Sequence, residues 1–288
     1  MLSLKDTFPI GIGTYRIDES DRADALWGLH HSFERGQNMM STGFSYGKGA
    51  VVDILGDFIP AIDREKLFLY TYVEPNVGSL AGVRTQLEDY LRILKTDYID
   101  CYQIHIPLET PLPMDGIYDE ILKLKEEGKI RYIGASNLSH QELLDLSSRM
   151  ELLSFEGLYN LECKTYEHLG TLDLCRERNM EFICYQPLRR NRIAKRDYPL
   201  LREMAEKYGR TQNQILLNWI IREKGLRAMV KSVTHANIDA NLDSLSFTLE
   251  PEDCQKLNDF RCPECDSIPV DWTGDGNGVQ INYLGNQF

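Results

Sequence analysis

The chain has 288 residues, of which 42% are hydrophobic and 26% charged, and these proportions are typical of a globular protein. Its formal net charge of −12 disfavours nucleic acids and anionic membranes as partners, since both repel an acidic protein. No apolar run approaches the ~20 residues needed to span a bilayer, and the first residues lack the basic-then-apolar pattern of a signal peptide. We therefore expect a cytoplasmic protein with no membrane partner.

Short aliphatic or β-branched runs alternate with longer segments of helical period, which is the pattern of parallel strands joined by crossover helices. The predicted strands cover residues 10–14, 38–41, 67–73, 98–105, 130–136, 155–160, 181–186 and 228–231. Eight strand–helix units without a Pro/Gly-rich linker predict an α/β fold, namely a single-domain (β/α)8 TIM barrel over residues 1–260. Residues 261–288 have no periodicity and carry Trp272 and Tyr283, so we expect an irregular C-terminal tail that covers the barrel mouth.

Helix boundaries also have sequence signals. Ser139 and Thr211 are followed three residues later by Glu142 and Gln214, a spacing that predicts capping boxes at two helix starts. Gly128 is predicted to end another helix in the left-handed conformation.

Seven cysteines, mostly inside apolar stretches, predict free thiols in a reducing compartment. Cys262 and Cys265 have the spacing of half a zinc or iron–sulfur site. Because no second pair follows at a matching spacing, we expect no metal.

In such a barrel the reactive groups lie at the carboxyl ends of the strands. In this chain those ends carry an unusual polar and aromatic set, namely Ser41, Tyr46, Tyr72, Glu74, His105, Ser136, Asn137, Glu156, Tyr185, Gln186, Lys231 and Ser232. Most buried histidines are core residues, but His105 ends an apolar strand where the barrel opens, which favours a functional role.

Residues 188–196 contain five cations among nine residues, although the chain as a whole is acidic. This segment is either a solvated charged loop or part of a site for an anionic ligand together with Lys231 and Ser232. Loops after strands 7 and 8 of such barrels commonly hold a phosphate, so the second interpretation predicts a dinucleotide or a phosphorylated substrate.

Several of these segments resemble motifs of the aldo-keto reductase family. The resemblance rests on residues 11–14, 36–47, 97–105, 134–137, 185–188, 230–232 and 241–242, and it extends over residues 8–260 in the family's order. It implies a barrel enzyme that reduces carbonyl groups with NADPH by means of a tyrosine, a lysine, an aspartate and a histidine.

The resemblance assigns this tyrosine to Tyr46 and the histidine to His105, whereas the aspartate position holds Ser41 and the lysine position holds Tyr72. Removing one partner of a buried ion pair costs ~3–5 kcal/mol, but replacing both can be nearly neutral, so the double change indicates a redesigned site. Without a neighbouring cation, Tyr46 is expected to keep a pKa of about 10 and to act as a neutral donor. Tyr72 and Glu74 are then expected to replace the missing pair through hydrogen bonds.

A cofactor site is also implied by the resemblance. Its expected members are Thr14, Ser136, Asn137, Glu156, Tyr185, Gln186, Arg189, Lys231, Ser232 and Asn241. Glu156 replaces a glutamine of the family, Asn237 an arginine and Ala240 a glutamate. We expect NADP(H), with NAD(H) as the alternative.

Three functions remain open. We favour an NAD(P)H-linked oxidoreductase that acts on a small-molecule carbonyl or related group with an altered proton donor. The alternatives are a redox-neutral dehydratase, isomerase or lyase, with an anionic substrate on the basic loop, and a non-catalytic ligand-binding homologue. The fold alone does not decide between them, and the sequence indicates neither the substrate nor the oligomeric state.

Overall fold

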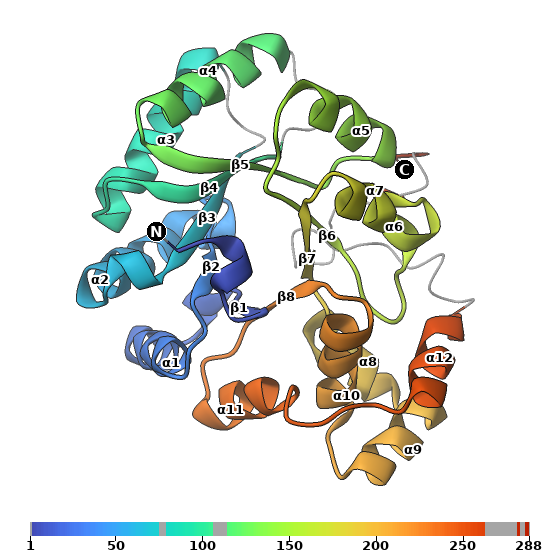
Figure 1. The fold of residues 1–288 in the computed structure, drawn as a ribbon. Helices are drawn as coiled ribbons and strands as arrows, with labels where there is room; N and C mark the ends of the chain where they lie inside the picture. The colour runs from blue at the N-terminus through green and yellow to red at the C-terminus, as the bar shows by residue number, and fades with distance from the viewer. Residues whose placement is uncertain (1, 75–78, 106–113, 263–280, 283–285, 288) are drawn as a thin grey trace.

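The computed structural model describes residues 2–74, 79–105, 114–262, 281–282 and 286–287. Eight parallel strands form one closed barrel in chain order, as predicted, and helices surround it (Figure 1). The strands are β1 (Ile10–Ile12), β2 (Met39–Ser41), β3 (Phe68–Val73), β4 (Ile99–Ile104), β5 (Ile130–Ser136), β6 (Ser154–Leu158), β7 (Glu181–Tyr185) and β8 (Arg227–Val230). The barrel closes where β1 pairs with β8, with Gly11 opposite Met229.

Longer helices and single turns connect the strands. The helices are α1 (Arg22–Glu34), α2 (Ala50–Phe58), α3 (Leu80–Leu94), α4 (Met114–Glu126), α5 (His140–Arg149), α6 (Thr165–His168), α7 (Thr171–Glu177), α8 (Arg192–Arg196), α9 (Pro199–Tyr208), α10 (Gln212–Asn218), α11 (His235–Asp243) and α12 (Pro251–Asp259). The 3₁₀ turns are η1 (Leu4–Asp6), η2 (Ile17–Glu19), η3 (Tyr46–Gly49), η4 (Ile59–Ala61), η5 (Arg64–Lys66) and η6 (Arg189–Asn191), while η7 (Trp219–Glu223) is a π-helix.

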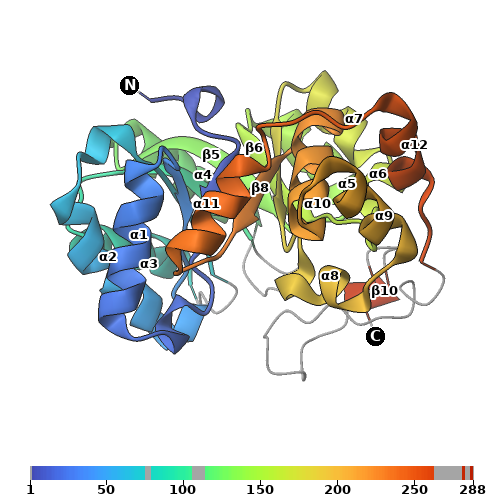
Figure 2. The ribbon, with the colours of Figure 1, turned by 90° about the horizontal axis from the view of Figure 1, so that it is seen from below.

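Two short strands of the C-terminal segment, β9 (Ile281–Asn282) and β10 (Asn286–Gln287), pair antiparallel. Trp272 and Tyr283, on which the predicted cover of the barrel mouth depends, lie outside the described residues. Figure 2 shows the N-terminus at one end of the barrel and α8 and β10 at the opposite end.

Side chains that alternate along each strand fill the barrel interior. The buried apolar and aromatic members of this interior are Leu4, Met39, Phe68, Tyr70, Tyr72, Cys101, Ile183 and Met229. The interior is tightly packed. A Cβ atom added at Gly134, for example, would lie only 2.9 Å from both Cys101 Sγ and Ser154 Oγ. A larger apolar core lies between the barrel and the surrounding helices and is formed by side chains from both.

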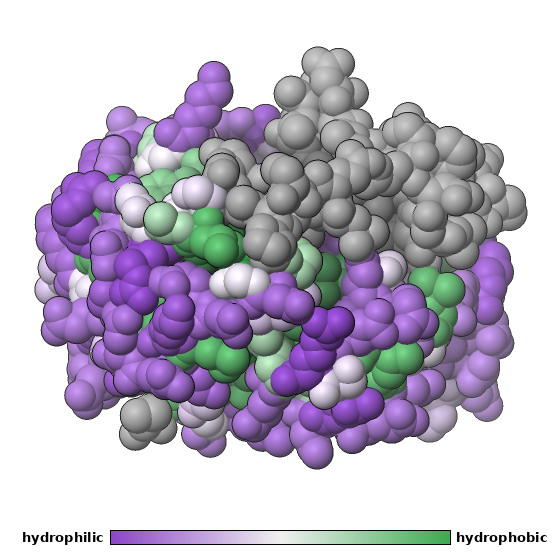
Figure 3. All heavy atoms as spheres, turned by 90° about the horizontal axis from the view of Figure 1, so that it is seen from above, coloured by the Kyte–Doolittle hydropathy of each residue, from purple (hydrophilic) through white to green (hydrophobic). Residues whose placement is uncertain are grey.

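The outer surface is mainly hydrophilic where the described residues are visible in Figure 3, and its apolar areas are small. Of the described helices, none combines the length and apolar character that crossing a membrane requires.

The predicted helix boundaries are confirmed. Ser139 with Glu142 and Thr211 with Gln214 form capping boxes, in which each side chain binds a backbone N–H of the other residue. Gly128, with φ of 74°, follows α4 in the left-handed conformation.

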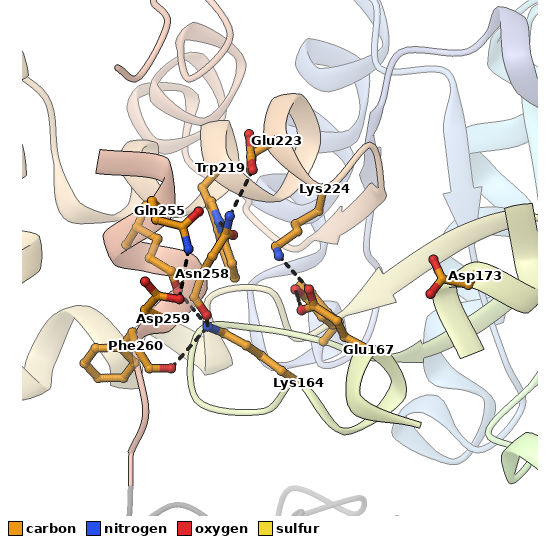
Figure 4. Close-up of polar contacts among 12 residues, drawn as sticks. Lys164, Glu167, Asp173, Trp219, Glu223, Lys224, Gln255, Asn258, Asp259 and Phe260 are labelled. Atoms are coloured by element: carbon orange, nitrogen blue, oxygen red, sulfur yellow. Dashed lines mark hydrogen bonds and ion pairs between the residues drawn. The ribbon is translucent and has the colours of Figure 1, made fainter. Parts of the chain in front are cut away.

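Lys164 fastens the loop after β6 to the end of α12 (Figure 4). Its buried ammonium group donates hydrogen bonds to the backbone oxygens of Leu257 (2.6 Å), Asn258 (2.9 Å) and Phe260 (3.2 Å). Carbonyls in the last turn of a helix lack intrahelical donors, and Arg261 also donates to those of Asn258 and Phe260, at 3.1 Å each. Trp219 Nε1 donates to Asn258 Oδ1 at 2.9 Å, so a second contact holds the same helix end.

A buried ion cluster joins β3, β4 and β5 on the helix side of the barrel. Asp100, which is fully buried, accepts hydrogen bonds from Arg64 (2.7 Å), Arg131 (3.1 Å) and the Leu69 backbone N–H (2.9 Å). Both guanidinium groups also contact the ring of Tyr98, at 4.1 Å for Arg64 and 3.5 Å for Arg131. The cluster compensates one buried carboxylate with two cations.

We predict that Asp100→Ala lowers the free energy of unfolding by about 3 kcal/mol, because two largely buried guanidinium groups lose their counter-ion. Urea unfolding followed by circular dichroism measures this loss. Asp115→Ala is the matched control, since the pair between Asp115 and Arg149 is exposed and its loss should cost less than about 1 kcal/mol. Equal losses in the two variants would contradict the prediction.

Candidate active site

Three of the predicted site residues meet at the carboxyl ends of β2, β3 and β4. Tyr46 begins the turn η3 after β2, Tyr72 lies near the end of β3, and His105 directly follows β4. The hydroxyl oxygens of Tyr46 and Tyr72 are 3.4 Å apart. The ring centroids of Tyr72 and His105 are 5.7 Å apart. Three side chains that can exchange or share protons therefore lie together where the barrel opens.

Glu156 on β6 lies on the inner side of this group. Its carboxyl group is 3% exposed and accepts hydrogen bonds from Tyr70 at Oε1 (2.9 Å) and from Tyr72 at Oε2 (2.8 Å). Burial raises the pKa of Glu156 to about 7, while hydrogen bonds from Tyr72, Tyr70 and Ser136 oppose the rise. Among the described residues, hydroxyl groups rather than cations thus compensate this carboxyl group.

That Glu156 is a cofactor ligand stays a prediction, and the structure brings it together with two tyrosines. Tyr70 was missed. A signal for it exists, because Tyr70 and Tyr72 are two residues apart on one strand and must share a face. The contact with Glu156 crosses the barrel and cannot be derived from either strand alone.

Tyr46 and Tyr72 both keep their protons at neutral pH. Burial raises the pKa of each tyrosine, and the nearby charge of Glu156 raises it further. The expectation that Tyr46 keeps a pKa of about 10 is therefore wrong, because the sequence shows neither the burial of its hydroxyl nor the carboxyl group of Glu156 nearby. Both residues are nonetheless neutral hydroxyl donors.

His105 is linked to the ends of β5 and β7. Asn137 Nδ2 lies 3.2 Å from His105 Nδ1, and Tyr185 donates a hydrogen bond to Asn137 Oδ1 at 2.8 Å. Burial lowers the pKa of His105 to about 4. A hydrogen bond with the Ser136 backbone acts in the opposite direction but is the smaller effect. His105 is therefore a neutral imidazole at pH 7, able to donate or accept one hydrogen bond.

Glu74 supports the loop that carries Tyr46. Its Oε1 accepts hydrogen bonds from the Tyr90 hydroxyl (3.0 Å) and the Ser45 backbone N–H (3.3 Å), and the Tyr90 hydroxyl in turn accepts from the Phe44 backbone N–H (2.8 Å). Glu74 was expected to substitute locally for the missing ion pair. The contacts described here give it a positioning role next to Tyr46 instead.

Ser41 and Thr14 lie at the base of the cluster. Thr14 is fully buried and donates its hydroxyl to the Ser41 backbone oxygen at 2.7 Å. Ser41 is also buried, and its side-chain hydrogen bond with Tyr70 opposes the rise that burial and Glu156 cause in the pKa of this tyrosine. Thr14 thus holds β1 to β2, and its predicted cofactor contact stays a prediction.

The basic loop after β7 binds a buried acid that the sequence analysis missed. Glu162 pairs with Arg189 (2.5 Å) and Arg196 (3.2 Å) and accepts a hydrogen bond from Tyr198 (2.8 Å). Two of the five cations are therefore already compensated, including Arg189, which was expected to bind cofactor. An anionic ligand on the rest of the loop stays a prediction.

The remaining predicted cofactor residues lie at the ends of β7 and β8. Lys231 follows β8 with an exposed side chain, and Ser232 donates a hydrogen bond to the Thr234 backbone oxygen at 3.4 Å. Gln186 follows β7 in the left-handed conformation, with φ of 51°, and Asn241 lies on α11. Gln186, Lys231 and Ser232 follow the carboxyl ends of their strands and so lie at the same end of the barrel as Tyr46.

Five cysteines are free thiols, as predicted, but Cys262 is disulfide-bonded, which corrects the prediction that all seven are free. The sequence spacing at this position had been weighed only as a metal site. No cluster of metal-binding side chains occurs among the residues that the structure describes.

Comparison with known proteins adds a family match. The model of the Aldo/keto reductase family matches residues 9–261. The chain is 29% identical to methylglyoxal reductase YeaE of Escherichia coli (strain K12) over 260 residues, 86% of this chain and 89% of that protein. It is 25% identical to glyoxal reductase of Bacillus subtilis (strain 168) over 266 residues, which cover 89% and 93% of the two chains.

A solved structure is also similar. The crystal structure of an aldo-keto reductase from Klebsiella pneumoniae in complex with NADPH superposes with a TM-score of 0.81 at 26% identity. The match covers 88% of this chain and 90% of that one. The similarity therefore extends over the whole barrel rather than a local motif.

We predict that Glu156→Gln stabilises the protein increasingly as the pH rises. The folded carboxyl group releases its proton near pH 7, whereas the unfolded one does so near its usual pKa of about 4.3. The contribution of Glu156 to the free energy of unfolding of wild type is therefore fully present at low pH. It is lost as the pH rises toward 7, because only the unfolded chain then releases the proton readily. Between about pH 4 and pH 8 the stability difference between variant and wild type should grow by up to about 3 kcal/mol.

Urea unfolding at several pH values measures this difference. Glu126→Gln on the exposed face of α4 is the control, and its stability relative to wild type should not change with pH. A difference for Glu156→Gln that stays constant across the same pH range would contradict a buried carboxyl group whose pKa is raised in the folded protein.

Proposed function

This chain belongs to the aldo/keto reductase family, and from that premise we propose that it is an NADP(H)-linked oxidoreductase that reduces a small-molecule carbonyl group. The observation that carries the proposal is the hydroxyl of Tyr46, 3.4 Å from that of Tyr72 and in one cluster with His105. A carbonyl oxygen bound between Tyr46 and His105 would meet two neutral hydrogen-bond donors.

The ends of β5, β7 and β8 fit a dinucleotide phosphate. Lys231 is exposed, and no carboxylate of the described chain pairs with it, so its charge is available to an anion. We propose that Lys231 and Ser232 hold a phosphate and that the half-buried Tyr185 packs against the nicotinamide, near Ser136 and Asn137. The bound reduced cofactor supplies the hydride. We propose that this phosphate is the adenosine 2′-phosphate, which NADP(H) carries and NAD(H) lacks.

In this proposal the proton-donor site differs from the one the family resemblance implies. Ser41 and Tyr72 occupy the positions of the aspartate and the lysine, so no ammonium group lowers the pKa of Tyr46. Burial and the charge of Glu156 raise that pKa instead, which makes Tyr46 a weak acid whenever Glu156 is ionised. His105, which is neutral, orients the carbonyl oxygen by a hydrogen bond.

A weak acid suits an electron-poor carbonyl group. A general acid typically contributes 10²–10⁴-fold to a rate, and less is needed when the carbonyl carbon is already activated by a second carbonyl beside it. Two relatives are named for the reduction of methylglyoxal and glyoxal, which are compounds of this kind. We therefore propose 2-oxoaldehydes as substrates and expect simple aldehydes to react slowly.

We predict that Tyr46→Phe lowers kcat for NADPH-dependent reduction of methylglyoxal by about 10²-fold or more, because the carbonyl oxygen loses its proton donor. The dissociation constant for NADPH, measured by calorimetry, should change little. Tyr98→Phe is the matched control and should retain the wild-type rate, because Tyr98 immediately precedes β4 and so lies at the opposite end of the barrel.

Two outcomes count against this function. An undiminished rate in Tyr46→Phe would show that the proton comes from another group. Conversion of methylglyoxal by wild type without oxidation of NADPH would support the redox-neutral alternative, in which the same side chains act as acid and base.

A further inference from the structure

We propose that Glu156 is the proton reservoir of this site and delivers a proton through Tyr72 to Tyr46. The inference rests on the proposed reduction of a carbonyl group. It begins from a continuous series of oxygen atoms that leads from the barrel interior to the barrel mouth. Glu156 Oε2 and the Tyr72 hydroxyl are 2.8 Å apart, and the Tyr72 and Tyr46 hydroxyls are 3.4 Å apart.

Tyr70 determines which oxygen of Glu156 carries the proton. Its hydroxyl donates to Oε1 at 2.9 Å and also has a side-chain hydrogen bond with Ser41. Tyr72 contacts Oε2 and can turn its hydroxyl toward Tyr46, so we place the proton of the neutral acid on Oε2. The two tyrosines on β3 thus have different roles, although both contact the same carboxyl group.

No other group in the cluster changes charge near neutral pH. The titratable and hydroxyl-bearing side chains that act on Glu156, or on which its charge acts, are Tyr46, Tyr70, Tyr72, Cys101, Ser136 and Cys184. Burial raises the pKa of Cys101 to about 12 and raises those of Cys184 and the three tyrosines above their usual range. The pKa of Glu156, about 7, is higher than that of His105 and lower than those of the cysteines and tyrosines, so Glu156 is the member of this set that titrates near neutral pH.

The transfer balances as follows. Hydride from the reduced nicotinamide cofactor forms the new C–H bond at the carbonyl carbon, so the cofactor is oxidised and the carbonyl reduced. The carbonyl oxygen takes the hydroxyl proton of Tyr46, Tyr46 takes that of Tyr72, and Tyr72 takes the carboxyl proton of Glu156. The products are an alcohol, two neutral tyrosines and a Glu156 carboxylate, which a proton from solvent resets.

The charge state of Glu156 also sets the direction of the hydrogen bonds. When Glu156 is ionised, Tyr72 donates to Glu156 and Tyr46 donates to Tyr72, so both protons point inward. When Glu156 is protonated, it donates to Tyr72, and both hydroxyls can turn so that Tyr46 donates toward the substrate. Hydroxyl protons rotate at little cost, so the oxygen positions suffice for both states.

The test follows the pH dependence of methylglyoxal reduction with saturating NADPH. In wild type, kcat should be highest below about pH 7 and fall about tenfold per pH unit above it, because the reservoir empties. Glu156→Gln keeps the size of the side chain and one acceptor oxygen, but its amide group holds no transferable proton. Its kcat should be about 10²-fold lower at low pH and independent of pH through neutrality.

Tyr70 and Tyr72 provide a matched pair of variants, since each phenylalanine removes one hydroxyl from the same carboxyl group. Tyr72→Phe interrupts the path and should abolish the pH dependence, as Glu156→Gln does. Tyr70→Phe leaves the path intact and removes a hydrogen bond that stabilises the carboxylate. It should therefore keep the sloping profile and move its midpoint to higher pH. Identical profiles for the two variants would overturn the proposal.

Infrared difference spectra of the protein without cofactor supply a readout independent of turnover. Wild type should show a protonated carboxyl band that titrates near pH 7 and is absent in Glu156→Gln, and absence of this band from wild type would overturn the reservoir. A pH profile that survives in Glu156→Gln, with its NADPH affinity intact, would overturn it as well. Failure of wild type to reduce methylglyoxal or other carbonyls at any pH would instead contradict the proposed function.

Discussion

A carboxyl group enclosed in a barrel must be neutralised, paired with a cation or surrounded by donors, and Glu156 is surrounded by donors. This requirement connects the other features of the site. Tyr70 and Tyr72 supply the hydroxyls, and Ser41, opposite Tyr70 in the strand register, is small and uncharged. An aspartate at that position would add a second carboxylate to an interior in which no described cation faces Glu156. Ser41, Tyr70 and Tyr72 are therefore all compatible with a buried carboxyl group at Glu156.

The closed barrel brings these groups to one point although they are far apart in the chain. Strands β2, β3 and β6 contribute Ser41, the tyrosines and Glu156, and the parallel register keeps their carboxyl ends at one level. Loops are fastened around them by polar contacts. Glu74 holds the loop before Tyr46, and buried Glu162 holds the basic loop after β7.

Strand periodicity and strand-end position were sufficient to predict the eight strands and the neighbourhood of Tyr46, Tyr72 and His105. The observed strand ends differ from the predicted ones by one or two residues, because a strand ends where its hydrogen-bond pairing ends rather than where the composition changes. The roles of Glu156 and Glu162 could not be predicted, because their partners lie on other strands and loops. Arg189 lies in a basic segment that is typical of an anion site, but in the structure it forms an ion pair with Glu162.

The series of oxygen atoms from Glu156 to Tyr46 has no built-in direction. An ionised Glu156 can receive a proton as readily as a neutral one can release it, and alcohol oxidation releases one. The barrel thus contains a buried buffer group of one equivalent, centred near neutrality. Acidification of the surroundings would fill it and favour reduction, and alkalinisation would empty it and favour oxidation. The enzyme would respond to cellular acid load without any bound effector.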